Sequence, residues 1–276
     1  ILAAGGKHLL IEKPLAITLE DADAIVEAAR RNGVQLITGP SHSFDHPVLL
    51  ARDMIASGDY GEVRMITALN YTDFLYRPRR LEELDTSKGG GVIFSQAVHQ
   101  VDVVRSLMGK RAERVFATTG SWDRSRPTEG AYQDGIGELG AEKDAAAYGT
   151  ARKALAQLSS PEDEAKLKSG RTYGAAVVPS PAPHAEHFGP IVVSCDRADL
   201  RLSAKGVEVW GDHEKTFVPA PAVPAPRAPV FRALYQAIRE NRPPLQSDSW
   251  GAASLEVCHA ILESAASGNA IELNRQ

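Results

Sequence analysis

Apolar positions near the start of the chain alternate between short continuous runs and a longer stretch with helical spacing. The run His8–Ile11 is continuous, which is typical of a parallel strand buried on both faces. The spacing over 18–32 predicts a helix, because its first residue is a threonine with an aspartate three residues later. Val34–Thr38 predicts the next strand. Residues 1–40 therefore have the strand–helix–strand order of a doubly wound α/β domain.

The pattern changes after Gly39 and Pro40, where we place a domain boundary. Residues 41–276 mix helices and alternating strands, which predicts an α+β domain, and an Ala- and Lys-rich stretch at about 142–170 predicts a helical insertion. The expected helices cover 47–57, 91–108, 230–240 and 250–267; the expected strands begin near 61 and cover 113–118, 191–195, 200–202, 207–210 and 270–273.

Composition excludes several classes of protein. The formal net charge of the 276 residues is -4, and no long basic run occurs, so we expect no nucleic-acid partner. No apolar run is long enough for a membrane span, and we expect no export signal. Only Cys195 and Cys258 occur, too few for a disulfide framework, which favours a cytoplasmic protein.

The opening segment 1–7 has the pattern of a helix end followed by a turn. We therefore expect the nucleotide-binding domain to be incomplete, without the strand, glycine-rich turn and helix that hold the pyrophosphate of a dinucleotide. The residue that distinguishes NAD from NADP would precede Ile1, so both cofactors remain open.

Two segments carry residues suited to chemistry. Glu12, Lys13 and Pro14 follow the first strand, at the edge where open α/β sheets place their ligands. A glycine turn, Gly89–Gly91, precedes a helix that can present Ser95 and His99 on one face. A strand-end lysine alone is more often a solvated residue, and a lone histidine is more often a core residue. We therefore infer a functional site only from the two segments together.

These two segments resemble the glucose-fructose oxidoreductase, inositol dehydrogenase and MocA family, whose members carry a Glu-Lys-Pro motif and later a triple glycine before an Asp-x-x-x-His helix. The resemblance implies a Rossmann domain followed by a domain with a large, mainly antiparallel sheet. It also implies that Glu12, Lys13 and Pro14 line the cofactor, that Lys13 contacts the substrate hydroxyl and nicotinamide ribose, and that His99 acts as acid or base or orients the substrate.

Ser95 departs from the family pattern, which has an aspartate at this position. A serine can form a hydrogen bond but supplies no negative charge to favour the imidazolium form of His99. His99 would then be the weaker base and Lys13 the better proton acceptor, unless a substrate carboxylate supplies the charge. We therefore assign the catalytic base to the pair rather than to either residue.

Within that family, the segments 39–45, 67–80 and 193–196 resemble dehydrogenases that oxidise phthalate cis-dihydrodiols. Arg77, Arg79 and Arg80 suit a dicarboxylate substrate, because guanidinium groups bind carboxylates with two parallel hydrogen bonds. The alternative reading of these arginines is a solvated basic loop. The resemblance also places His42 and Ser95 among the substrate-contacting residues.

Other functions remain open. A sugar or cyclitol dehydrogenase of the same family would not depend on the three arginines, and a non-catalytic dinucleotide-binding sensor would bind without turnover. The pairs His42/His46 and His184/His187 suggest a metal-dependent hydrolase or lyase as a further alternative. The first pair lies in a Ser-rich turn where the resemblance places substrate-contacting residues, and the second lies in a Pro-rich linker without a carboxylate at ligand spacing, so we expect no metal. The family resemblance implies a homo-dimer or homo-tetramer.

The segment Tyr132–Ile136 is shorter than the resemblance implies, because the family carries a further pair of sheet strands there. A sheet that lost interior strands would expose its core and leave backbone groups unpaired. We therefore expect residues to have been omitted at this point and before Ile1, although a true deletion stays open.

Overall fold

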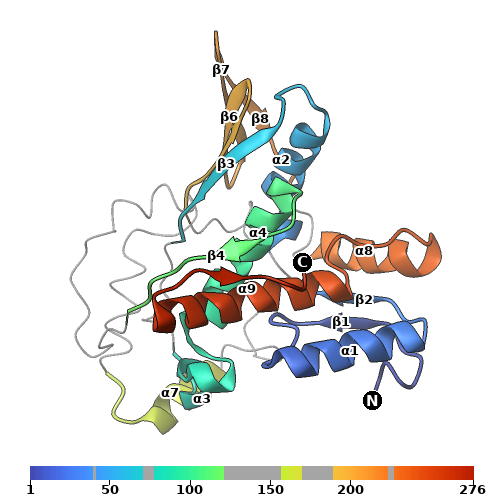
Figure 1. Cartoon of the computed structure of the whole chain (residues 1–276), viewed down its shortest axis with the longest axis vertical. Coiled ribbons are helices and arrows are strands. Elements are labelled where there is room, and N and C mark those ends of the chain that lie inside the picture. The colour runs from blue at the N-terminus through green and yellow to red at the C-terminus, as the bar shows by residue number, and fades with distance from the viewer. Residues whose placement is uncertain (40–41, 71–77, 121–156, 170–188, 223–226) are drawn as a thin grey trace.

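The protein is described by a computed structural model over residues 1–39, 42–70, 78–120, 157–169, 189–222 and 227–276 (Figure 1). Its strands are β1 (Leu9–Ile11), β2 (Leu36–Thr38), β3 (Val63–Ala68), β4 (Arg114–Val115), β5 (Ile191–Cys195), β6 (Ala198–Ser203), β7 (Gly206–Gly211), β8 (Lys215–Pro219) and β9 (Ile271–Glu272). Its helices are α1 (Leu19–Arg31), α2 (His46–Ala56), α3 (Leu81–Leu84), α4 (Val98–Met108), α7 (Pro161–Ser169), α8 (Ala228–Arg239) and α9 (Asp248–Ser267), with short 3₁₀ turns at His42–Phe44 and Thr86–Lys88 and a π-helical turn at Ile93–Ala97.

The first layer of the molecule contains β1, α1 and β2, as the apolar pattern predicts. The two strands pair in parallel, with Leu9 opposite Leu36. The hydroxyl of Thr18 accepts a hydrogen bond from the Asp21 backbone N–H at 3.1 Å, which caps the first turn of α1. The predicted strand–helix–strand unit is therefore confirmed.

Helix α9 belongs to the same layer, although it lies more than two hundred residues further along the chain. It packs against α1 and β2 (Figure 1), and its Leu255 is fully buried among apolar side chains from both. The backbone N–H of Thr38 in β2 donates to the Gln246 carbonyl at 3.0 Å, so this buried donor has a hydrogen-bond partner. This core contains side chains from both sides of the boundary expected near Gly39, so that boundary stays a prediction.

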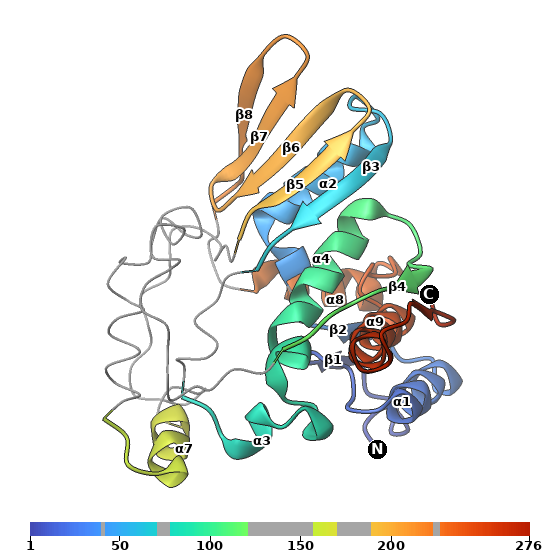
Figure 2. The same ribbon diagram turned by 60° about the vertical axis from the view of Figure 1, so that its left-hand side comes forward.

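The second layer is an antiparallel sheet in the order β3-β5-β6-β7-β8 (Figure 2). Alternate residues of its strands point to opposite faces. Helices α2 and α4 cover one face, and the core between them includes the fully buried Val193, Leu200 and Val207. The predicted strands at 191–195, 200–202 and 207–210 are confirmed, with slightly different bounds.

Several expectations fall wholly or partly outside the described residues. These include Arg77, His184 and His187, the segment Tyr132–Ile136, and most of the helical insertion expected at 142–170. Within that insertion, α7 is described, and the Asp163 backbone N–H donates to the Ser160 hydroxyl at its start. None of the described helices is both long and apolar enough to cross a membrane.

Removing the Leu255 side chain should test how strongly α9 holds the first layer together. We expect Leu255→Ala to lower the free energy of unfolding by about 2–5 kcal/mol, because it leaves a cavity in a closely packed core. The measurement is chemical denaturation followed by circular dichroism. Leu81→Ala is the control, because Leu81 is 65 % exposed; equal losses for both variants would contradict this account.

Candidate active site

Lys13 lies immediately beyond the carboxyl end of β1, where its side chain reaches across to the turn before α4. Its Nζ donates a hydrogen bond to the Ser95 carbonyl oxygen at 2.7 Å. The Lys13–Pro14 peptide bond is cis. A strand from the first layer and a helical turn eighty residues later therefore meet at this amine.

His99 and His42 lie side by side next to Lys13. The centroids of the two imidazole rings are 4.7 Å apart, and the planes are tilted by 58°. His42 Nδ1 is 2.6 Å from a carboxylate oxygen of Asp45. The Nδ1 atom of His99 is buried and has no hydrogen-bond partner among the described residues. The structure thus brings together three residues that the sequence singled out.

Burial changes the protonation of both basic groups. The pKa of Lys13 is lowered from 10.5 to about 8 mainly by this burial; the nearby Glu12 carboxylate opposes the shift, and the Arg79 guanidinium adds to it. Burial also lowers the pKa of His99 to about 2, with smaller contributions from Lys13 and His42. Near neutral pH, His99 is therefore a neutral imidazole, whereas most of Lys13 is protonated and its neutral fraction grows as the pH rises toward 8.

Ser95 contacts Lys13 through its main-chain carbonyl and not through its hydroxyl. The segment around it, Ile93–Ala97, is a π-helical turn, whereas the spacing predicts one regular α-helix over 91–108. A π turn has a wider hydrogen-bond spacing than an α-helix, so residues four apart no longer lie directly above one another. Ser95 and His99 therefore do not lie directly above one another, as the predicted α-helix would place them.

A buried polar network lies next to the histidines. The Asp102 carboxylate accepts hydrogen bonds from the Ser43 hydroxyl and the Trp250 indole N–H. Gln246 Nε2 donates to the Ser43 hydroxyl at 2.8 Å, and both residues are buried. The sequence predicts Asp102 as a helix-surface or interdomain hydrogen-bonding group, but the structure buries it, and its partners Ser43 and Trp250 lie on the same side of the boundary expected near Gly39 as Asp102 itself. Sequence reasoning missed the other three residues, because their partners are distant along the chain.

Arg79 and Arg80 of the predicted arginine cluster differ in burial and in their partners. The Arg79 side chain is buried near Lys13, and its Nη1 is 3.8 Å from a Glu83 carboxylate oxygen. Arg80 is half exposed, pairs with Glu82 and Glu83 at the start of α3, and has no contact with Lys13 or His99 in the described structure. Glu12 is exposed and lies 3.5 Å from Arg227. Of the described arginines in the predicted cluster, Arg79 alone lies beside Lys13.

Comparison with known proteins shows to which family the chain belongs. Residues 1–40 match the family model described as the oxidoreductase family with an NAD-binding Rossmann fold, and residues 48–160 match the GFO/IDH/MocA C-terminal domain. The chain is 39% identical over 289 residues to 1-carboxy-3-chloro-3,4-dihydroxycyclohexa-1,5-diene dehydrogenase of Comamonas testosteroni, covering 94% of this chain and 73% of the relative. The chain belongs to the GFO/IDH/MocA oxidoreductase family. The predicted family, fold class and NAD-type cofactor are thereby confirmed.

Other relatives support the same assignment. A putative dehydrogenase from Bordetella bronchiseptica RB50 superimposes with a TM-score of 0.86 at 38% identity, covering 98% of this chain and 78% of that structure. Myo-inositol 2-dehydrogenase of Thermotoga maritima is 30% identical over 115 residues, which are 42% of this chain and 33% of the relative. The chain is thus an NAD-dependent oxidoreductase of this family.

The residues of the site fit the nicotinamide end of the cofactor. Lys13 lies at the carboxyl end of a parallel strand, where this fold places its ligands, and the buried His99 Nδ1 beside it lacks a partner. Glu12, Lys13 and Pro14 would line that end. The turn that holds the pyrophosphate in such folds is not among residues 1–39, so we derive no contacts for the other end.

The titration of Lys13 provides a direct test of its buried position. In protein carrying ¹³C-labelled lysine, we expect the Cε resonance of Lys13 to titrate with a midpoint near pH 8, because burial favours the neutral amine. The resonance is assigned by its loss in Lys13→Met. The amine should be protonated below this midpoint and neutral above it; a midpoint at the ordinary lysine value would contradict the account.

Proposed function

We propose that the protein oxidises a secondary alcohol of a carboxylated cyclic cis-diol, with a phthalate cis-dihydrodiol as the specific substrate. The observation that carries this proposal is the cluster of Lys13, His42 and His99 beside the buried Arg79. The cluster supplies a proton acceptor of lowered pKa next to a positive charge. The relative from Comamonas testosteroni, whose name describes a carboxylated dihydroxycyclohexadiene, supports a substrate of this class.

Lys13 is the proposed proton acceptor. Its pKa of about 8 lets the neutral amine take the hydroxyl proton of the substrate at mildly alkaline pH, whereas His99 with a pKa of about 2 is too weak a base at that pH. Neutral His99 then holds the hydroxyl through a hydrogen bond. The proton on Lys13 leaves a positive charge where the alkoxide develops, which stabilises that charge in a site partly shielded from water.

A nicotinamide held at the Lys13 end of the strand would supply the acceptor for the hydride of the carbinol carbon. The carbon–hydrogen bond breaks as the carbonyl forms, and the hydroxyl proton moves to Lys13, so the substrate loses two electrons and two hydrogens. For an arene dihydrodiol, the resulting ketone tautomerises to a catechol. The aromatic ring that forms makes the oxidation favourable.

Turnover of a defined panel tests this proposal. With the protein and NAD or NADP, we expect growth of the reduced-nicotinamide absorbance with a phthalate cis-dihydrodiol, and not with inositol or glucose. Lys13→Met should lower kcat by about 100- to 10,000-fold, the usual contribution of a general base. The rate should rise as the pH increases through about 8, because the neutral amine is the acceptor.

Matched variants separate the alternatives. Lys7→Met is the control, since Lys7 is exposed. Arg79→Gln should raise KM for the dicarboxylate about tenfold or more and leave the dimethyl ester little changed, whereas Arg80→Gln should affect neither. Turnover of polyols alone would assign the protein to the sugar and cyclitol dehydrogenases, which the similarity to myo-inositol 2-dehydrogenase favours. Cofactor binding without any turnover would favour a sensor.

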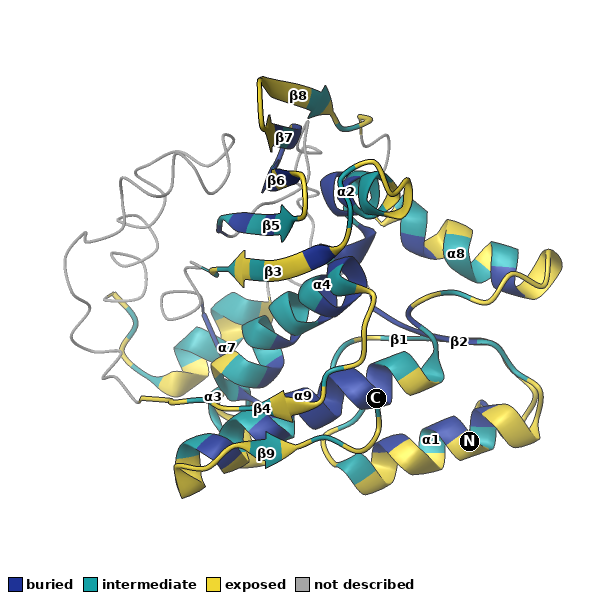
Figure 3. Cartoon of the chain, turned by 45° about the horizontal axis from the view of Figure 1, so that its top comes forward, coloured by how far each residue is buried: buried dark blue, intermediate teal, exposed yellow. Residues whose placement is uncertain are grey.

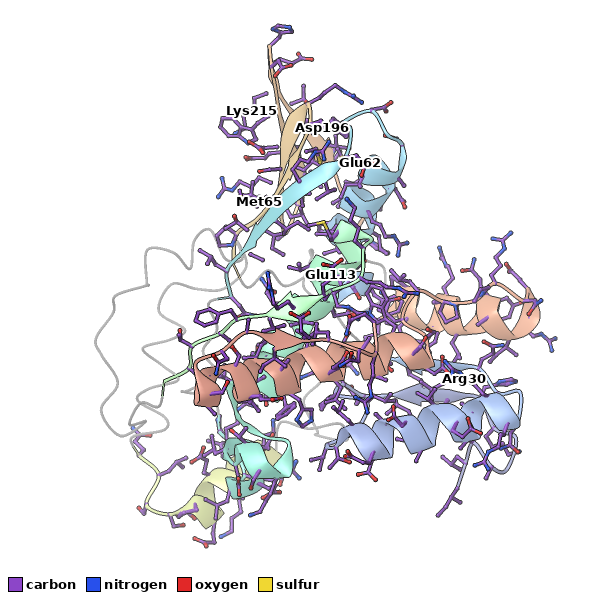
Figure 4. The ribbon with its side chains drawn as sticks, in the orientation of Figure 1. Arg30, Glu62, Met65, Glu113, Asp196 and Lys215 are labelled. Atoms are coloured by element: carbon purple, nitrogen blue, oxygen red, sulfur yellow. The ribbon has the colours of Figure 1, made fainter. Side chains whose placement is uncertain are left out.

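We also propose that the protein forms a homo-dimer or homo-tetramer through the open face of the antiparallel sheet. This face carries the exposed Met65, Trp210 and Phe217, and Lys215 Nζ lies 4.2 Å from the Trp210 ring. Figure 4 shows Met65 and Lys215 on the side of the sheet away from α2. The ion-paired Arg201, Glu208 and Lys215 lie on the same face. Large exposed apolar side chains with polar neighbours are typical of a protein interface.

Sedimentation equilibrium tests the assembly. We expect a mass of two or four chains, and a shift toward one chain in Phe217→Asp, because a charge in an apolar interface is costly. Phe231→Asp is the control, since Phe231 is also exposed but lies on α8. A single-chain mass for the unmodified protein at micromolar concentration would contradict the proposal.

A further inference from the structure

A second candidate binding site lies in a groove between α2 and α8, apart from the cluster around Lys13. Figure 3 shows where these two helices lie in the fold. The groove encloses about 1420 Å³ of space that opens to solvent. Its walls come from α2, from α8 and from the segments that precede and follow α8. Its lining includes Phe44, Leu49, Arg52, Arg232, Arg242 and Leu245.

The groove concentrates positive charge. Arg52, Arg232 and Arg242 line it, and no aspartate or glutamate is among the described residues that do so. Arg242 lies 3.5 Å from a Glu240 carboxylate oxygen. Arg52 and Arg232 form no ion pair or hydrogen bond with the described part of the chain, and Arg52 is half buried. An unpaired, partly desolvated guanidinium favours an anionic partner.

Most of the remaining lining is apolar, with His46, Gln236 and Gln246 as its uncharged polar members. Phe44 is buried and Leu49 is half buried on one side, while Pro229 and Leu245 lie on the other. Small-molecule sites combine such apolar walls with a few polar groups that fix orientation. Inorganic anions gain little from apolar walls, whereas an organic anion with a ring can use both features. The groove is basic although the formal net charge of the chain is -4.

We propose that this groove binds a small aromatic carboxylate, with Arg52 and Arg232 as the anchors of its carboxylate groups and Phe44, Leu49 and Leu245 in contact with its ring. Arginine suits this role because its planar fork matches a carboxylate. The site is separate from the proposed catalytic cluster and does not depend on the proposed substrate. Its ligand would also contact Gln246, which lines the groove and donates to Ser43 beside His42.

Calorimetric titration of the full chain with phthalate, as a planar dicarboxylate probe, tests the site in the absence of a nicotinamide cofactor. We expect saturable binding that weakens at least tenfold in the double variant Arg52→Gln/Arg232→Gln, because two charge-assisted contacts are lost. Arg239→Gln is the matched control. It removes the same charge from α8 at an exposed position that does not line the groove, and we expect less than a twofold change.

Two further ligands test which chemical groups the groove recognises, and one further variant tests where phthalate binds. Dimethyl phthalate should not bind measurably, because it lacks the charges, and inorganic phosphate should bind at least tenfold more weakly than phthalate, because it lacks the ring. Lys13→Met should retain phthalate binding. Binding that survives in the double variant but disappears in Lys13→Met would place the ligand at the catalytic cluster and overturn the proposal. Equal affinity for phosphate and phthalate, or no binding of phthalate, would overturn it as well.

Discussion

The buried carboxylate of Asp102 is the constraint on which the arrangement of the site depends. A carboxylate removed from water must be hydrogen-bonded, and this one is satisfied by Ser43 and Trp250. Those two residues come from the segment after β2 and from α9, while Asp102 lies on α4. His99 is one turn before Asp102 and His42 adjoins Ser43, so the same hydrogen bonds that join three segments also set the two imidazole rings together.

Burial at this junction also sets the chemistry of the basic groups. Desolvation is the largest cause of the lowered pKa of both Lys13 and His99. Arg79 also lowers the pKa of Lys13 while Glu12 opposes the shift, and Lys13 and His42 lower the pKa of His99. The aspartate that the family places four residues before the histidine would oppose this effect at His99. Its replacement by Ser95, whose carbonyl holds the Lys13 amine, is consistent with Lys13 as the proton acceptor.

Arg79 and the two groove arginines, Arg52 and Arg232, lie in different environments. Arg79 is buried beside Lys13 and has Glu83 nearby, so a substrate carboxylate would compete with an internal partner. Arg52 and Arg232 face an open groove without acidic lining and have no partner in the described structure. A carboxylate that enters the groove therefore displaces only water, which is a reason to expect binding there that is independent of catalysis.

The sequence by itself determined many of the elements and the candidate residues, but not the π-helical turn at Ile93–Ala97 or strand β8. Apolar spacing and the Thr18 cap identified β1, α1 and β2, and the motif around Lys13 and the later glycine turn identified the family, because these signals are local in the chain. Only the tertiary structure decided that α9 completes the first layer, that Arg79 rather than Arg80 lies beside Lys13, and that Gln246 and Trp250 support the histidines. Each of these depends on contacts between residues far apart in sequence, whose pairing no local pattern encodes.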